Sequence, residues 1–215
     1  MRRSAVRIRL GPPKFILNHP YPMLSVKIFL VRHGQDTDNA TGVLNGRRDT
    51  ELTELGREQA KTVAKKLTDN NIQVIYASPL KRAYETARII AQELRLDTVT
   101  ADEHLIERDF GVLTGQPVAD IPKYAKKTLQ TEHVNYFLEV EGAENFPTLY
   151  ERARKILQEI RQRHPNENVL LVTHGDIGKM IRAAYHKWDW EDGLKTPYFD
   201  NTGILELSEK QDVLE

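Results

Sequence analysis

The 215-residue sequence contains no cysteine, no long apolar run and no net charge. The lack of cysteine excludes disulfides, thiolate nucleophiles and every metal or redox site that is built on sulfur. No apolar run reaches the length of a membrane-spanning helix, so we expect no spanning segment. Hydrophobic residues make up 40% and charged residues 29% of the chain, a balance that is typical of one globular domain.

Positive charge is concentrated at the start of the chain. Residues 1–22 hold five basic residues, no acidic residue and four prolines, and they show no helical or strand period. The rest of the chain carries 26 basic against 31 acidic residues. This mildly acidic body does not favour a nucleic-acid partner.

Three interpretations of residues 1–22 stay open: a targeting peptide, a nucleic-acid-binding arm and a mis-assigned start. Residues 6–13 can be back-translated into a stretch that resembles the T-arm and CCA end of a transfer-RNA gene. We therefore favour Met23 as the natural start, with residues 1–22 a disordered extension and residues 23–215 a single domain.

Short β-rich runs alternate with amphipathic segments from residue 26 to residue 207. This alternation predicts an α/β fold, a three-layer, doubly wound and mostly parallel sheet with helices on both faces. Thr53 is a candidate N-cap, and Ser78-Pro79 is expected to open the following helix. The expected strands are 26–31, 73–77, 98–101, 168–173 and 203–207, and the expected helices are 53–67, 78–94, 118–140, 147–163 and 176–185.

Two apolar strands end in nearly the same tripeptide, Arg32-His33-Gly34 and Thr173-His174-Gly175. Ligands bind beyond the carboxyl ends of strands in open α/β sheets, so both imidazoles share one crevice if these strands are neighbours. Each histidine alone could be a structural residue, but two such sites favour a functional pair. Zinc is disfavoured because there is no cysteine and no His-x-x-x-His pair, and because arginine would repel the cation.

An arginine beside a histidine suits phosphoryl transfer. Arginine offers a planar fork of donors to phosphate, and histidine can act as a nucleophile. Arg82, early in the helix after the second strand, is a candidate second cation, with a solvated helix residue as the alternative. Glu107 lies between apolar residues and a glycine, where a raised pKa would suit a general acid; the alternative is a surface glutamate.

At these residues the chain resembles the histidine phosphatase superfamily, the phosphoglycerate-mutase-like group. The similarity extends from Lys27 to about Gly203 and rests on four blocks in order. They are LVRHGQ (30–35) followed by LTELGREQA (52–60), ASPLKRAYETA (77–87), LIERDFG (105–111) and VTHG (172–175).

The resemblance implies a role for each matching residue. His33 is expected to be the nucleophile that becomes phosphohistidine, and Glu107 the acid that protonates the leaving alcohol and then activates water. Further residues are expected to contact the phosphoryl oxygens without any metal or other cofactor: Arg32, Arg82 and His174, assisted by Asn39 and the amide of Gly175. Arg108 is either an anion-binding residue for the substrate or a surface charge.

Hydrolysis and mutase chemistry share the first step, so the residues alone leave the reaction open. Mutases of the family carry a longer insertion between the acid and the second histidine, whereas Glu107 and His174 are only 67 positions apart here. We therefore favour a metal-independent phosphomonoesterase acting on a small phosphorylated metabolite, in the cytoplasm. The alternatives are a 2,3-bisphosphoglycerate-dependent phosphoglycerate mutase, a non-catalytic phospho-ligand-binding module and a phosphoprotein phosphatase. Specificity is expected from residues 108–145, which contain Tyr124, His133, Tyr136, Phe137 and Glu144.

Overall fold

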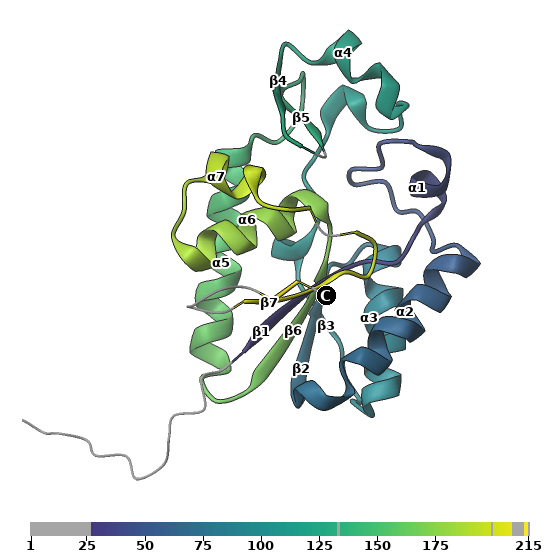
Figure 1. The fold of residues 1–215 in the computed structure, drawn as a ribbon, viewed down its shortest axis with the longest axis vertical. Coiled ribbons are helices and arrows are strands. Elements are labelled where there is room, and N and C mark those ends of the chain that lie inside the picture. The colour runs from purple at the N-terminus through teal and green to yellow at the C-terminus, as the bar shows by residue number, and fades with distance from the viewer. Residues whose placement is uncertain (1–26, 133, 199, 208–212, 215) are drawn as a thin grey trace, which may run out of the picture.

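The computed structural model describes residues 27–132, 134–198, 200–207 and 213–214, so the extension 1–22, Met23 and His133 lie outside the described residues. A six-stranded sheet in the order β3-β2-β6-β1-β7-β8 forms the centre of the described chain (Figure 1). Its strands are β1 (Ile28–Arg32), β2 (Ile72–Ala77), β3 (Thr100–Ala101), β6 (Asn168–Thr173), β7 (Ile204–Leu207) and β8 (Val213–Leu214).

Four neighbouring strands of this sheet are parallel. β6 pairs in parallel with β1 on one side and with β2 on the other, and β2 pairs in parallel with β3. β7 runs antiparallel to β1, and β8, which the sequence pattern does not reveal, runs antiparallel to β7. The expected mostly parallel α/β sheet is confirmed, and the carboxyl ends of β2, β6 and β1 lie side by side.

Helices cover both faces of the sheet, because alternate side chains of a buried strand point to opposite sides. In β1, Ile28 and Leu30 join the core beneath α5, α6 and α7, whereas Phe29 and Val31 join the core beneath α2 and α3 (Figure 1). The bounds are α2 (Glu54–Lys66), α3 (Lys81–Leu94), α5 (Phe146–Arg163), α6 (Gly175–His186) and α7 (Trp190–Lys195).

Two glycines bring the loop after β1 against the start of α2. Thr53 caps α2 as expected, its Oγ1 accepting the N–H of Gly56 at 3.0 Å. A Cβ on Gly56 would lie 2.1 Å from the carbonyl oxygen of Gln35, and one on Gly34 would lie 2.4 Å from that of Gly56. Backbone atoms cannot move aside as a flexible side chain can, so this contact, next to His33, requires glycine on both sides.

The helix expected over 118–140 is wrong. This segment holds the short helix α4 (Ile121–Tyr124) and then an antiparallel hairpin of β4 (Lys127–Gln130) and β5 (Asn135–Glu139). Consecutive aromatic residues explain the strand: Tyr136 packs into the core beneath α5, while Phe137 packs on the opposite side against Phe110. Such two-sided burial of adjacent residues needs the period of a strand.

Smaller elements also differ from expectation. α3 begins at Lys81 rather than at Ser78, and the loop expected before Asp49 contains the short helix α1 (Thr37–Thr41). Among the described residues, no helix combines the length and the apolar character needed to cross a membrane. Single 3₁₀ turns occur at Thr68–Asn70, Glu103–Leu105, Gly111–Leu113 and Val118–Asp120.

Candidate active site

The two strand-end histidines meet. Because β1 and β6 are direct neighbours, with Arg32 opposite Thr173, the rings of His33 and His174 have centroids 5.0 Å apart. Both side chains are buried, and the backbone N–H of His33 donates to the carbonyl oxygen of Thr173 at 3.0 Å. The expectation that the sheet brings the two imidazoles into one place is therefore met.

The hydrogen bonds of His33 fix its tautomer. Nδ1 lies 2.7 Å from the carbonyl oxygen of Gly34, which can only accept, so Nδ1 carries the hydrogen and Nε2 keeps its lone pair. Burial, followed by the positive charges of Arg82 and Arg32, lowers the pKa of His33 well below its ordinary value. The ring is thus neutral at neutral pH, and its Nε2 lone pair, which accepts from Nε of Arg82 at 3.2 Å, is the one that a nucleophile would use.

Arg82, in the first turn of α3, is held against His33 by backbone carbonyls. Its Nη1 donates to the carbonyl oxygen of Arg48 at 2.6 Å and its Nη2 to that of Gly46 at 2.8 Å. Its Nε lies 3.2 Å from Nε2 of His33 and 3.2 Å from Oδ2 of Asp36. The side chain is fully buried, so the guanidinium is fixed in place beside the nucleophile.

Asp36 supports this arrangement and was not identified from the sequence. Its carboxylate is fully buried, pairs with Arg82 and accepts from Asn45 Nδ2 at 2.7 Å and from the backbone N–H of Asn39 at 2.8 Å. Asp36 is the N-cap of α1, in the loop that also carries His33 after the end of β1, and an aspartate just before a short helix is the signal that the sequence offers. Asp36 thus balances the buried charge of Arg82 and orients its guanidinium.

Arg32, at the end of β1, keeps a donor available. Its Nε is buried without a hydrogen-bond partner among the described residues, and its Cζ lies 5.1 Å from the ring centre of Tyr198. A buried guanidinium N–H without a partner is costly, so this donor is suited to an anionic ligand.

His174 contacts the hydroxyl group of Ser78, which can donate to its ring. Its Nε2 lies 2.8 Å from Oγ of Ser78, and that oxygen also accepts the backbone N–H of Leu80 at 3.3 Å. The hydroxyl hydrogen of Ser78 can then go to Nε2 of His174, which leaves Nδ1 as the protonated nitrogen. Nδ1 is buried and has no partner among the described residues, and burial and Arg82 lower the pKa of His174. His174 is thus a neutral N–H donor, and the sequence pattern missed Ser78.

Glu107 is buried at the start of α6. Its Oε1 accepts the backbone N–H of Arg108 at 2.9 Å and of Ile177 at 3.3 Å, and its Oε2 that of Asp176 at 3.4 Å. Burial and the carboxylate of Asp176 raise the pKa of Glu107, while the N–H groups oppose this shift. The positive charge of Arg82 also acts to lower the pKa of Glu107, against the effect of burial.

Arg108 is held between a carboxylate and aromatic rings. Its side chain is fully buried, its Nε donates to Asp176 at 2.7 Å, and its guanidinium lies 4.1 Å from the ring centre of Phe137 and 4.3 Å from that of Phe146. This placement is typical of a structural cation. Its Nη2, however, is buried without a hydrogen-bond partner among the described residues, so anion binding by Arg108 stays a prediction.

Asn39 and Gly175 contact residues of the segment before β7, and their roles as phosphoryl-binding groups stay predictions. Asn201 Nδ2 donates to Oδ1 of Asn39 at 3.1 Å and to the carbonyl oxygen of His33 at 2.9 Å. With Oδ1 engaged, the amide hydrogens of Asn39 stay available for a ligand. Gly175 is the first residue of α6, and a Cβ there would lie 2.2 Å from the phenol oxygen of Tyr198. Asn201 and Tyr198, from the segment before β7, were not identified from the sequence.

The residues expected to set specificity are dispersed. Tyr136 and Phe137 are buried on β5, and Tyr124 is partly exposed on α4. Glu144 faces inward, where its carboxylate pairs with Arg152 at 2.9 Å and Arg47 at 3.0 Å. Within the described part of the chain, no group of three or more His, Asp or Glu side chains is arranged to hold a metal ion.

The chain is similar in sequence and in fold to known proteins. The family model of the histidine phosphatase superfamily (branch 1) matches residues 28–214. Phosphoserine phosphatase 1 of Hydrogenobacter thermophilus is 37% identical over 150 residues, which cover 69% of this chain and 71% of that protein. A metal-independent phosphoserine phosphatase of Arabidopsis thaliana is 35% identical over 169 residues, covering 74% and 67% respectively. Mycobacterial glucosyl-3-phosphoglycerate phosphatase, solved with VO3, superposes with a TM-score of 0.75 at 26% identity over 88% of this chain and 97% of that chain.

Proposed function

Because the chain belongs to the histidine phosphatase superfamily, we propose that it hydrolyses a small phosphomonoester without a metal ion, through a phosphohistidine on His33. The observation that supports this most is the pairing of two buried imidazole rings, with centres 5.0 Å apart, and a buried arginine whose Nε donates to Nε2 of His33. One ring has the lone pair to attack phosphorus, and the other has an N–H to offer a phosphoryl oxygen.

In the first step, Nε2 of His33 attacks phosphorus and the bond from phosphorus to the ester oxygen breaks. The leaving oxygen takes the bonding electrons and a proton from the Glu107 carboxyl group. Arg32, Arg82 and His174 stabilise the negative charge on the non-bridging oxygens in the transition state. Glu107 is then an anion, ready to act as a base.

In the second step, the Glu107 carboxylate takes a proton from water as the water oxygen attacks phosphorus. The bond between phosphorus and Nε2 breaks, its electrons return to the imidazole, and phosphate leaves. The enzyme regains a neutral His33 and a protonated Glu107. Burial and the charge of Asp176 raise the pKa of Glu107, and this shift favours the protonated carboxyl group that the first step requires.

A non-catalytic binding module is disfavoured by Glu107. A phosphate-binding site needs cations and N–H donors, and a carboxylate close to them would repel the ligand unless it served as an acid. The names of two relatives make L-phosphoserine the first substrate to assay. A mutase would instead require a bisphosphate primer and would exchange phosphate between hydroxyls faster than it releases phosphate.

The decisive experiment compares His33→Ala and Glu107→Gln in the presence of EDTA. We expect His33→Ala to abolish turnover and the acid-labile phosphoenzyme. Glu107→Gln should slow phosphoenzyme formation from an alkyl phosphate by about 10²–10⁴-fold, but from p-nitrophenyl phosphate far less, because p-nitrophenolate leaves without a proton. The later attack of water, which uses Glu107 as base, should slow for both substrates. Glu103→Gln, an exposed carboxylate on the same segment, is the matched control and should behave as wild type.

Three results would overturn the proposal. Turnover by His33→Ala at the wild-type rate would exclude His33 as the nucleophile. Equal losses in the rate of phosphoenzyme formation from the two substrates in Glu107→Gln would exclude the acid role. Loss of wild-type activity on adding EDTA would exclude a metal-independent mechanism.

A further inference from the structure

The backbone N–H groups that hold Glu107 belong to the two partners of a buried ion pair. Oε1 of Glu107 accepts the N–H of Arg108 at 2.9 Å, and Oε2 accepts that of Asp176 at 3.4 Å. The side chains of the same two residues also meet, because Nε of Arg108 donates to Oδ2 of Asp176 at 2.7 Å. The ion pair thus links the two backbone segments that hold the Glu107 carboxyl group.

This ion pair joins the loop that carries the acid to the start of α6. Asp176 lies in the first turn of α6, 68 positions after Arg108. The first N–H groups of a helix have no partner within the helix, and Glu107 accepts two of them, because its Oε1 also accepts the N–H of Ile177 at 3.3 Å. Since α6 follows His174 directly, the ion pair fixes the acid relative to the second histidine of the site.

Arg108 is held in one orientation. Its Nη1 donates to the carbonyl oxygen of Glu144 at 3.2 Å, and its guanidinium lies between the rings of Phe137 and Phe146. Its side chain is fully buried, and Asp176 is buried as well. Either charge alone would be costly at this depth, so each partner depends on the other. A pair that is fixed in this way can hold a third group in a single orientation.

Asp176 also acts on Glu107 through its charge. Burial, followed by the carboxylate of Asp176, raises the pKa of Glu107. The N–H groups that Glu107 accepts and the positive charge of Arg82 on α3 act in the opposite direction. A helix N-terminus by itself favours the ionised form of a carboxyl group, so an aspartate in the same turn offsets this effect and favours the proton that the first step requires.

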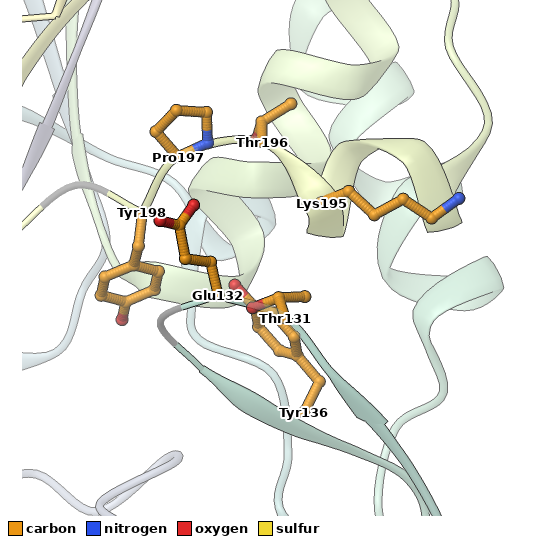
Figure 2. Close-up of a pocket in the computed structure, with 7 residues that line it drawn as sticks. All are labelled: Thr131, Glu132, Tyr136, Lys195, Thr196, Pro197 and Tyr198. Atoms are coloured by element: carbon orange, nitrogen blue, oxygen red, sulfur yellow. The ribbon is translucent and has the colours of Figure 1, made fainter.

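The ion pair is not part of the small hollow beside the two nearest phenols. Tyr136 on β5 and Tyr198 lie within electrostatic range of Glu107, and both are on the wall of a hollow of about 60 Å³ (Figure 2). The rest of its wall consists of Thr131, Glu132 and residues 195–197. Because neither Arg108 nor Asp176 lines this hollow, their contacts point to the acid rather than to a ligand there.

We propose that Arg108 and Asp176 are positioning residues, whose buried ion pair fixes the Glu107 carboxyl group for proton transfer to the leaving oxygen. The inference rests on the proposed phosphatase function and deepens it, because it gives this ion pair a role in the first step. A carboxyl group that turns away from the leaving oxygen cannot donate its proton, so the ion pair acts through Glu107 on the rate of phosphoenzyme formation.

The test uses the double variant Arg108→Met with Asp176→Asn, because removing one partner alone would leave a buried, unpaired charge. Methionine adapts to the space between the phenylalanine rings. We expect phosphoenzyme formation from 2-hydroxyethyl phosphate to slow by about 10²-fold, the scale of a small misplacement of a catalytic group. Formation from p-nitrophenyl phosphate should change far less, because its leaving group needs no proton.

The matched control removes an exposed ion pair from α5. Arg154 and Glu151 meet at 3.0 Å, and Arg154→Met with Glu151→Gln should keep both rates at the wild-type level.

The same double variant in the Glu107→Gln background separates positioning from other roles. Residues that act through Glu107 should cause no further loss once its carboxyl group is gone. Carboxymethyl phosphate, which has an anionic leaving group, reports on anion binding by Nη2 of Arg108, a buried donor without a partner among the described residues. A loss confined to that ester would assign Arg108 to anion binding and overturn the positioning role. Equal losses for 2-hydroxyethyl and p-nitrophenyl phosphate, or a further loss in the Glu107→Gln background, would overturn it too.

Asp176→Asn alone gives a second measurement, since an asparagine can still accept from Nε of Arg108. Removing the neighbouring charge should lower the pKa of Glu107, so the basic limb of phosphoenzyme formation from 2-hydroxyethyl phosphate should move down by about one pH unit. An unchanged limb would overturn the inference while wild-type phosphoenzyme leaves the phosphatase function standing. A wild-type protein that forms no phosphoenzyme from p-nitrophenyl phosphate would instead overturn the phosphatase function, and this inference with it.

Discussion

His33 and His174 expose different ring nitrogens to a ligand, because a carbonyl oxygen contacts Nδ1 of His33 and a hydroxyl group contacts Nε2 of His174. A carbonyl oxygen accepts from Nδ1 of His33 and so leaves Nε2 as a base. A hydroxyl on Nε2 of His174 leaves Nδ1–H as a donor. Burial keeps both rings neutral, so neither adds charge beside Arg82. One residue type thus provides two chemical functions, and the partner of each ring decides which.

If the hydroxyl of Ser78 holds the His174 ring in one tautomer, Ser78→Ala should release the ring from it. Without the hydroxyl, His174 can place its hydrogen on either nitrogen, and the N–H that stabilises the phosphoryl oxygens is only partly populated. We expect kcat/KM to fall by about 10²-fold, the scale of one lost transition-state donor. The ¹⁵N chemical shifts of the His174 ring should move toward a mixture of tautomers.

Ser78→Thr keeps a hydroxyl at this position and serves as the control, with recovery of both the rate and the shifts. Wild-type kcat/KM together with unchanged ring shifts in Ser78→Ala would show that Ser78 does not set the tautomer.

At the residue scale, the sequence predicts the side chains that follow directly from strand ends and motif blocks. His33, Arg82 and Glu107 come together as expected, because β1 and β6 are neighbours and α3 starts at the same edge. Arg108 and Ser78 show the limit. Arg108 packs on Phe137, which is 29 positions away, and Ser78 contacts His174, which is 96 positions away. No local sequence pattern reveals partners at such distances along the chain.

At the element scale, α5 holds the loop that carries Glu107. Arg152 in α5 donates from Nη1 to the carbonyl oxygens of His104, at 3.0 Å, and of Ile106, and from Nη2 to Glu144 at 2.9 Å. One planar guanidinium thus satisfies backbone carbonyls that would otherwise lack donors and ties the loop to the helix.

Arg152→Lys tests this role. A lysine keeps the charge but cannot span the same acceptors, so the Glu107 loop should loosen. We expect the free energy of unfolding to fall by about 2 kcal/mol, as for a charged hydrogen-bond network that loses part of its contacts. Phosphoenzyme formation from an alkyl phosphate should fall more than that from p-nitrophenyl phosphate, because only the alkyl leaving group needs a proton from Glu107.

Arg154→Lys changes an exposed arginine on the same helix, where its partner is Glu151, and should alter neither quantity. If both variants behave alike in urea unfolding and in the ratio of the two rates, Arg152 is not what holds the loop.

The elements predicted well are those whose burial gives a clear period. The parallel strands β1 and β6 read as continuous apolar runs, and α5 reads as an amphipathic helix. The sequence does not predict the β4–β5 hairpin because both faces of β5 are buried. The main core covers one face, and Phe110 and its neighbours cover the other, so β5 lacks the alternation of polar and apolar residues that marks a half-exposed strand. The direction of β7 depends on strand pairing and leaves no local trace.

At the scale of the whole molecule, the sheet and its two helical layers exclude water from the histidines. His33 and His174 are almost completely buried, which is why the pKa of each is lowered. Burial therefore links the chemistry of the site to the stability of the fold. Between the ordinary pKa of 6.5 and the lowered pKa, the unfolded chain binds protons that the folded chain does not.

This difference predicts that the free energy of unfolding falls as the pH is lowered from 7.5 to 5.5. Each of the two histidines contributes a slope of up to about 1.4 kcal/mol per pH unit below pH 6.5. Glu107 acts in the opposite direction, because its raised pKa lets the folded state keep a proton that the unfolded state loses above pH 4.5. Urea unfolding at pH 7.5, 6.5 and 5.5 measures the net slope.

His174→Asn removes one of the two buried histidines and should flatten the dependence of unfolding free energy on pH. His186→Asn, in the last turn of α6, is the control variant and should keep the wild-type slope. Equal slopes in wild type and His174→Asn would show that proton uptake by His174 does not limit acid stability.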